Sequence, residues 1–170
     1  MKKIKLTQGY KCLVNDEDFK WLNVFKWAAT VVRNKAGEVK YVYATRTYYE
    51  KDGTHTTVQM HRWILGVEDS KTRVDHKDRD GLNNQRENLR VATVSQNLQN
   101  QELRPNNTSG FKGVVRSATG KRWYSQIGVD GRKLSLGTFD FPEEAAQAYD
   151  KAAYLLFGKF ALTNHELGLI

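Results

Sequence analysis

Cysteine is almost absent from this chain, and its scarcity excludes two kinds of structural cross-link. Cys12 is the single cysteine, so no internal disulfide can form. A structural zinc site usually needs four cysteine or histidine ligands, and the chain offers Cys12 and four scattered histidines. We therefore expect no structural zinc, and any bound metal should have mainly oxygen ligands, as magnesium, manganese and calcium do.

Long apolar runs are missing as well. A membrane-spanning helix needs about 20 consecutive apolar residues, and no stretch of the sequence approaches that length. Lys2 and Lys3 are not followed by the apolar segment that a secretory signal would have. We therefore expect no membrane partner and a location inside the cell.

Negative charge is in the minority. The chain has 27 lysines and arginines against 19 aspartates and glutamates, a net charge of +8. Such a balance favours a polyanionic partner such as nucleic acid. The excess is uneven, because residues 110–137 hold six basic residues and one acidic residue, whereas residues 138–170 hold two and five. The basic segment is the natural place to seek a nucleic-acid contact.

The 170 residues are enough for one medium domain or two small ones. Residues 105–110 contain no apolar side chain and are rich in turn formers, which is typical of a linker. We therefore predict an α+β protein with two domains, at residues 1–104 and at residues 111–165.

The first 60 residues are predicted to be rich in β-strands. Asn15 is expected to cap a short helix that carries Asp18, Trp21, Leu22 and Phe25, and a second short helix should begin at His61. A hairpin should turn at residues 34–37. Strands are predicted at residues 10–14, 27–32, 41–49 and 56–60.

Residues 74–90 form the most polar and most informative segment. A short strand from residue 73 should end at Asp75 and His76, and a long polar loop should lead to a second strand at residues 89–92. Thr93 can then cap a helix that runs to about residue 101. This strand–loop–strand–helix order would let Asp75 and Asn97 face one cation, with His76 on the other side of a bound phosphate.

These residues and their spacing resemble the HNH nuclease family with its ββα-metal fold, and more closely its phage and intron-encoded homing endonucleases. The third histidine of that family is Asn97 here, a variant common among homing members. Residues 1–104 would then hold a β-rich region plus the nuclease domain. The matching residues are Val74-Asp75-His76, Asn83-Asn84, Asn88-Leu89-Arg90 and Asn97, preceded by Met60-His61-Arg62.

The resemblance implies a site-specific DNA endonuclease in which His76 is the general base and Asn88 braces the loop as the second catalytic residue. Asp75 and Asn97 would hold a single Mg²⁺ or Mn²⁺ ion. His61 and Arg90 could contact the substrate, although the sequence slightly favours a hydrogen-bonding role within the fold for His61. A monomer would nick DNA and a homodimer could cut both strands, in the cytoplasm of a bacterial or phage-infected cell.

The second half is predicted to be a three-stranded antiparallel sheet packed on one helix. Strands are expected at residues 113–116, 123–129 and 133–136, and the helix should run from Pro142 to Phe157 and stop at Gly158. Strand alternation puts Trp123, Ile127 and Val129 under the helix, continued by Leu134 and Leu136. The opposite face and its edges would bind DNA through Lys112, Arg116, Lys121, Arg122, Tyr124, Gln126, Arg132, Lys133 and Ser135.

This half resembles the Apetala-type (plant ethylene-response-factor) DNA-binding domain over about residues 110–164. The resemblance implies a sheet that binds double-stranded DNA. Ser135 and Gly128 depart from the family, and an extra residue falls near Arg122, so the base preference does not carry over. The segments that match are Gly113-Val114, Gly120-Lys121 with Trp123, Leu136-Gly137-Thr138-Phe139, Glu144-Ala145-Ala146-Gln147-Ala148-Tyr149-Asp150 and Ala161-Leu162-Thr163-Asn164.

Two other functions stay open. The chain could be a non-enzymatic, sequence-specific DNA-binding regulator with a decayed nuclease half, or a nuclease directed at RNA or at nucleic-acid structure. Asp75, His76, Asn88 and Asn97 are all retained, which argues against decay. The DNA-binding sheet predicted for the second half argues against the RNA alternative.

Overall fold

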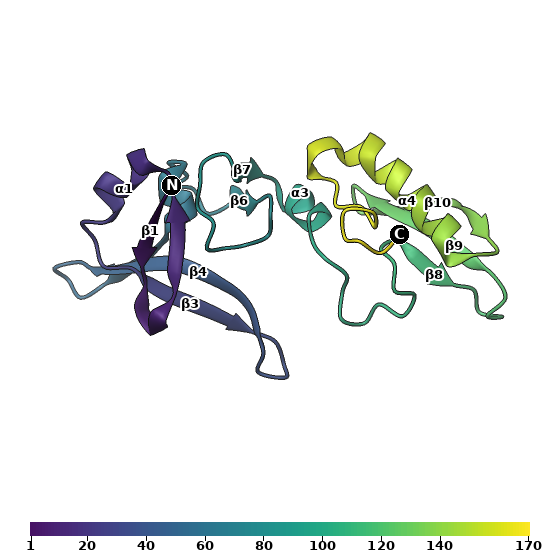
Figure 1. Ribbon diagram of the computed structural model, residues 1–170, viewed down its shortest axis with the longest axis horizontal. Coiled ribbons are helices and arrows are strands. Elements are labelled where there is room, and N and C mark those ends of the chain that lie inside the picture. The colour runs from purple at the N-terminus through teal and green to yellow at the C-terminus, as the bar shows by residue number, and fades with distance from the viewer. The chain divides into compact units, whose positions relative to one another are not determined.

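Three clusters of buried apolar side chains organise the chain in the computed structural model, which describes residues 1–170 (Figure 1). The first core draws on residues between Ile4 and Leu89. The remaining core residues lie between Phe111 and Ala161. The chain accordingly divides into two compact units, Met1–Val94 and Ser95–Ile170, so α3, which starts at Val94, falls almost wholly in the second unit. No helix is both long and apolar enough to cross a membrane.

The first unit consists of three small antiparallel sheets and two short helices. The sheets are β1–β2, β3–β4–β5 and β6–β7. The predicted strands are confirmed to within two residues, and a helix follows Asn15 as expected. The bounds are β1 Lys2–Lys5, η1 Thr7–Gly9, β2 Lys11–Val14, α1 Asp16–Leu22, β3 Ala28–Arg33, β4 Val39–Tyr49, β5 His55–Gln59, α2 Met60–Ile64, β6 Arg73–His76 and β7 Leu89–Ala92.

Strand β1 was not predicted, because Ile4 is its single apolar residue. Ile4 is buried and pairs with Cys12 of β2. Burial of this one side chain and the backbone pairing with β2 fix the strand, whereas its lysines stay in solvent. A single apolar position gives no periodic signal, so pairing between strands, and not local pattern, decides this element.

The prediction that the Asn15 side chain caps α1 is wrong. Asn15 does stand at the N-cap position, but its side chain makes no capping hydrogen bond. Its oxygen instead accepts the backbone N–H of Arg86 at 2.7 Å, and its amide donates to Glu87 at 3.0 Å. The residue therefore joins the start of α1 to a loop that lies 71 and 72 positions further along the chain.

The two faces of β4 serve different purposes. Val42 and Ala44 are buried in the core of the unit. Tyr43 points to the opposite face, as strand alternation requires, and its ring contacts two histidine rings from other elements. The long strand thus joins the hydrophobic core to the polar residues described below.

The second unit confirms the predicted three-stranded antiparallel sheet with one covering helix. The strand order is β10–β9–β8, and α4 lies across one face of the sheet (Figure 1). Strand β10 is longer than expected and contains a bulge between Ser135 and Gly137. The bounds are α3 Val94–Gln99, β8 Val114–Arg116, β9 Trp123–Val129, β10 Arg132–Phe139, α4 Pro142–Phe157 and η2 Gly158–Phe160.

Close contact between sheet and helix depends on small residues. Ala145, Ala146 and Ala153 of α4 are fully buried. Gly113 precedes β8 with a φ of +77°, and a Cβ atom there would lie 1.9 Å from the ring of Tyr149. A side chain at residue 113 would therefore push the helix away from the sheet.

Candidate active site and DNA-binding surface

Three aromatic rings from three elements meet in the first unit. The rings of His61 on α2 and His76 on β6 stand edge to face, with centroids 4.9 Å apart. The ring of Tyr43 on β4 lies 5.8 Å from His61 and 6.2 Å from His76. We call Tyr43, His61 and His76 the ring cluster. The cluster brings together His76, which was predicted to be the general base, and His61, whose role was left open. Tyr43 was not singled out from the sequence.

Both histidines of the ring cluster are buried, and burial lowers their pKa values. Desolvation, aided by the nearby charges of His76 and Arg62, takes the pKa of His61 to about 3. The pKa of His76 is also lowered by burial, although Asn84 and the carboxylates of the segment oppose the shift. Both imidazoles are therefore neutral at pH 7, and a neutral imidazole can accept a proton. His61 Nδ1 is buried without a hydrogen-bond partner.

Asp75 lies next to His76 at the end of β6 and faces Arg90 across the β6–β7 pair. The guanidinium group of Arg90 holds Asp75 Oδ2 at 2.6 and 2.7 Å. Both side chains are less than a tenth exposed. Removal of either partner of this buried ion pair would leave an uncompensated charge in the interior.

The loop between β6 and β7 is braced by Asn88. Its side-chain amide donates to the Asp78 carboxylate and to the Asn83 carbonyl, both at 2.8 Å. Its oxygen accepts the backbone N–H of Asp78 at 3.1 Å. In the same loop, a Cβ atom on Gly81 would lie 2.5 Å from the Val42 carbonyl oxygen. The absent side chain therefore lets the loop lie directly against β4.

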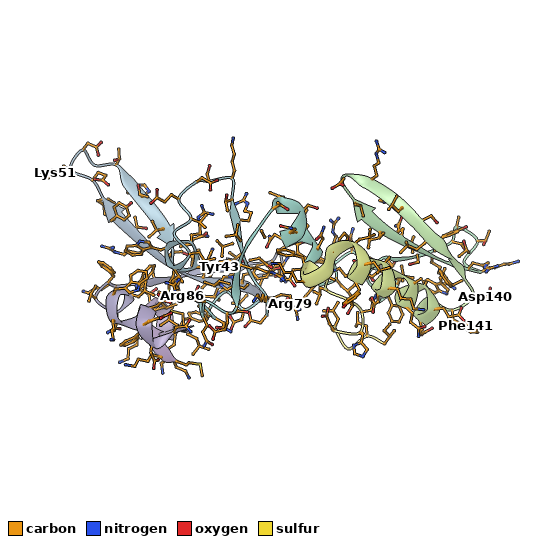
Figure 2. All side chains as sticks on the ribbon, turned by 90° about the horizontal axis from the view of Figure 1, so that it is seen from above. Tyr43, Lys51, Arg79, Arg86, Asp140 and Phe141 are labelled. Carbon is orange, nitrogen blue, oxygen red and sulfur yellow. The ribbon has the colours of Figure 1, made fainter.

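The amino-terminal strand and helix hold the same loop from the other side. Leu13 of β2 donates its N–H to the Leu82 carbonyl at 2.8 Å and accepts the Asn84 N–H at 2.9 Å. Arg86 binds the buried carboxylate of Asp18 on α1 with two hydrogen bonds, at 2.7 and 2.8 Å, and Figure 2 shows Arg86 beside that helix. The site residues therefore depend on segments far from them in sequence.

Sequence reasoning did not assign the Asp18–Arg86 pair, but a signal was present. Asp18 occupies the apolar stripe of α1 together with Trp21 and Leu22, and it is only 1% exposed. A charged side chain on a buried stripe requires a charged or hydrogen-bonded partner. The sequence could not show which of the many basic residues supplies it.

The donor groups fit a magnesium ion that takes few protein ligands and completes its shell with water and substrate. No three histidine, cysteine, aspartate or glutamate side chains are arranged to hold a metal ion. Mg²⁺ commonly takes one or two protein carboxylates and completes its shell with water and substrate phosphate. Asp75 can supply such a carboxylate from β6. Asn97 lies half-buried on α3 in the second unit, and its role as a ligand stays a prediction.

The sheet of the second unit presents the predicted polar face. Lys133 pairs with Gly128, and Ser135 pairs with Gln126, so these residues alternate with the buried Ser125 and Ile127 as expected. Tyr124 is exposed on this face. The guanidinium of Arg116 lies 5.4 Å from the ring of Trp123 and donates to the Gly120 carbonyl at 3.1 Å. Lys121 and Arg132 are exposed near the ends of strands.

Two further predicted DNA contacts, besides Arg116, have partners within the structure. The ammonium group of Lys112 donates to the carbonyl oxygens of Gln99 and Gln101, each at 2.7 Å. Arg122 donates to the Thr138 carbonyl and lies 3.3 Å from the Asp140 carboxylate. Lys112 therefore fastens the end of α3 to its unit, which leaves the other residues of the face as the stronger candidates for DNA.

Comparison with known sequences matches each unit to a family. Residues 58–99 match the profile of the HNH endonuclease family, and residues 109–159 match the AP2 domain. The chain combines an HNH segment with a carboxyl-terminal AP2 domain. The predicted resemblance to HNH nucleases and to the Apetala-type domain is thereby confirmed, and the closer likeness to homing endonucleases stays a prediction.

Individual relatives are of the same two kinds. An uncharacterised HNH endonuclease of Acanthamoeba polyphaga mimivirus is 35% identical over 112 residues, which cover 63% of this chain and 57% of the relative. An ethylene-responsive transcription factor of Medicago truncatula is 38% identical over 85 residues, or 49% of this chain and 31% of the relative. An AP2-like ethylene-responsive transcription factor of Arabidopsis thaliana is 49% identical over 61 residues, or 35% and 11%. The chain thus spans little more than half of the first relative and much less of the plant proteins.

Proposed function

We propose that this protein is a site-specific DNA endonuclease of the homing type. The observation that carries the proposal is a buried, neutral imidazole, His76, next to the charged carboxylate of Asp75 in the segment that matches HNH endonucleases. A general base must be unprotonated at the working pH, and burial gives His76 that state.

In the proposed reaction, His76 takes a proton from a water molecule. The oxygen of that water attacks the phosphorus of a DNA phosphodiester, and the 3′ oxygen leaves. Asn88 keeps the loop in place through its bonds to Asp78 and Asn83. Asp75 and Asn97 would hold a magnesium or manganese ion, which when bound neutralises charge on the phosphate and on the leaving oxygen.

His61 and Arg90 are proposed as substrate contacts. The unpartnered Nδ1 of His61 is a buried polar atom next to the proposed base, and such atoms usually have a partner. A phosphate oxygen or its bound water would supply one. Arg90 already neutralises Asp75, so it would reach a phosphate only by sharing or exchanging that partner.

The AP2 domain would choose where the nuclease acts. Its exposed face carries Arg132, Lys133 and Tyr124, and basic groups that track phosphates make binding tighter and dependent on salt. Its covering helix begins with Glu143 and Glu144. The resulting field would turn the basic sheet, not the helix, toward DNA.

The test is cleavage of supercoiled DNA by the full chain with and without Mg²⁺. Nicked circles would indicate one active site per event, and linear DNA would indicate paired sites, as in a homodimer. Untouched DNA that is nevertheless bound in a gel-shift assay would replace the proposal with the DNA-binding regulator. Cleavage of RNA in preference to duplex DNA would instead assign the chain as a nuclease directed at RNA.

A further inference from the structure

Asn84 is the most enclosed polar residue of the loop, and the proposed reaction gives it no role. It is 0% exposed. Its backbone N–H is held by the Leu13 carbonyl of β2 at 2.9 Å, and its side-chain oxygen lies 3.4 Å from His76 Nε2. A buried carboxamide fixed from the backbone and aimed at one nitrogen of the proposed base can control that base.

The orientation of the Asn84 carboxamide follows from its second partner. Its amide nitrogen lies 3.5 Å from the Gly81 carbonyl oxygen, and a carbonyl oxygen can only accept a hydrogen bond. The nitrogen of Asn84 must therefore face Gly81. Rotation of the carboxamide by 180° would set oxygen against oxygen, so the Asn84 oxygen is the atom that faces His76.

This orientation determines which nitrogen of His76 carries its proton. The Asn84 oxygen accepts and cannot donate, so Nε2 of His76 must donate to it. A neutral imidazole has a single N–H, and the lone pair is therefore on Nδ1. The rings of His61 and Tyr43 pack against the imidazole and oppose its rotation.

We infer that Asn84 is a positioning residue that makes His76 Nδ1 the proton-accepting atom of the nuclease. The inference rests on the proposed function for its catalytic consequence, but the hydrogen bond and the tautomer can be measured without any cleavage. Because the backbone of Asn84 is hydrogen-bonded to Leu13, strand β2 takes part in setting the tautomer of His76. That strand lies outside the segment that matches the HNH family.

The direct test is a long-range ¹H–¹⁵N NMR spectrum of the full chain labelled with ¹⁵N-histidine. The protonated and unprotonated nitrogens of a neutral imidazole resonate far apart, and the signals of His76 are assigned by their absence from His76→Gln. We expect a protonated Nε2 and an unprotonated Nδ1. A spectrum with the proton on Nδ1 would overturn the inference in the unmodified protein, whatever the variants do.

Two variants test the cause. Asn84→Leu keeps a similar volume without an acceptor, and Asn84→Ala removes the acceptor with a smaller side chain, so both should give a mixture of the two tautomers. An unchanged tautomer in a folded Asn84→Leu protein would contradict the inference. If that variant does not fold, an unchanged tautomer in Asn84→Ala would contradict it equally.

Kinetics then separate positioning from simple support of the fold. With saturating DNA, the single-turnover cleavage rate of Asn84→Leu should fall by about 10²-fold or more, within the range that a misplaced base costs, while the dissociation constant for DNA stays unchanged. A tautomeric mixture with an undiminished rate would overturn the catalytic role of Asn84. If the wild-type protein cleaves no DNA, the proposed function fails, and the NMR spectra still decide which nitrogen Asn84 binds.

Discussion

The two units of this chain use polar residues in opposite ways. In the first unit the important polar groups are buried and bound to one another, as Asp75 is to Arg90 and His76 is to Asn84. In the second unit the corresponding groups, such as Lys133 and Tyr124, stand exposed on a sheet. A proton acceptor must be held in one state and one place, whereas a surface that follows phosphates needs mobile charge in solvent. The comparison predicts large effects for substitutions in the first unit and small, additive effects in the second.

The largest effect is expected for His76→Ala. Loss of the proposed general base should reduce the cleavage rate by about 10²–10⁴-fold, and DNA affinity should remain near the wild-type value, because the sheet of the second unit is intact. The measurement is single-turnover cleavage together with a gel-shift titration. His55→Ala is the matched control, since His55 is an exposed histidine of the same unit. Full cleavage by His76→Ala would remove His76 from the reaction.

The buried state of His61 predicts a loss of stability in mild acid. Its pKa is lowered to about 3 in the folded chain from an ordinary value near 6.5 in the unfolded chain. The unfolded chain therefore takes up the proton first, and stability is full above about pH 6.5 and declines as the pH falls toward 3. Between pH 6 and pH 4 the decline from this residue should be about 2 kcal/mol.

The measurement is urea denaturation of wild-type protein and His61→Phe at several pH values. Phenylalanine keeps the ring and removes the titrating nitrogen, so the variant should show a shallower decline. His55→Phe replaces an exposed histidine and should follow the wild-type curve. Equal slopes for His61→Phe and wild type would mean that His61 is not held neutral by the fold.

A smaller effect is expected from the Asp18–Arg86 pair, which joins α1 to the loop between β6 and β7. Asp18→Ala should destabilise the first unit by about 2 kcal/mol, less than the 3–5 kcal/mol of a fully buried pair. The reason is that the Arg86 side chain is 44% exposed and can turn to water. Glu17→Ala removes an exposed carboxylate 3.5 Å from the same guanidinium, and such a surface contact is worth about 0–1 kcal/mol.

Chemical denaturation of the two variants measures this contrast. If Asp18→Ala and Glu17→Ala cost the same free energy, the anchoring of the loop by Asp18 is unsupported. If Asp18→Ala also slows cleavage while DNA binding is preserved, the loss of anchoring reaches the residues around His76.

The sequence predicted most of this fold because each element carries its own signal. Helix α4 starts at Pro142 and ends before Gly158 as expected, and the alternation along β9 placed Ile127 under the helix. Asp75 and His76 were found as neighbours because they are adjacent in the chain. The contacts of His76 with Tyr43 and Asn84, and of Arg86 with Asp18, were not predicted, because a local pattern does not say which side chains tertiary packing brings together.

The same distinction between local pattern and tertiary contact explains why the helix cap was predicted wrongly. Asn15 has the composition of a helix cap, yet its side chain binds Arg86 and Glu87, since a distant loop offers it better partners than α1 does. Lys112 was proposed as a DNA contact from its charge, and the structure adds that its ammonium group binds two carbonyl oxygens. Its contact with DNA stays a prediction. Composition predicts what a residue is able to bind, and the fold decides what lies within its reach.

The smallest effect is expected on the exposed sheet, where Lys133→Ala should weaken DNA binding by a few-fold at low salt. If Lys133 neutralises one phosphate, the slope of log affinity against log salt concentration should fall by about 0.9. Lys151→Ala is the matched control, because Lys151 is an exposed lysine on the covering helix α4, and it should leave the slope unchanged. Equal effects of the two substitutions would mean that the net charge of the domain, and not its sheet face, attracts DNA. A loss confined to Lys133→Ala, with the cleavage rate at saturating DNA unaltered, would assign recognition to the exposed face and chemistry to the buried site.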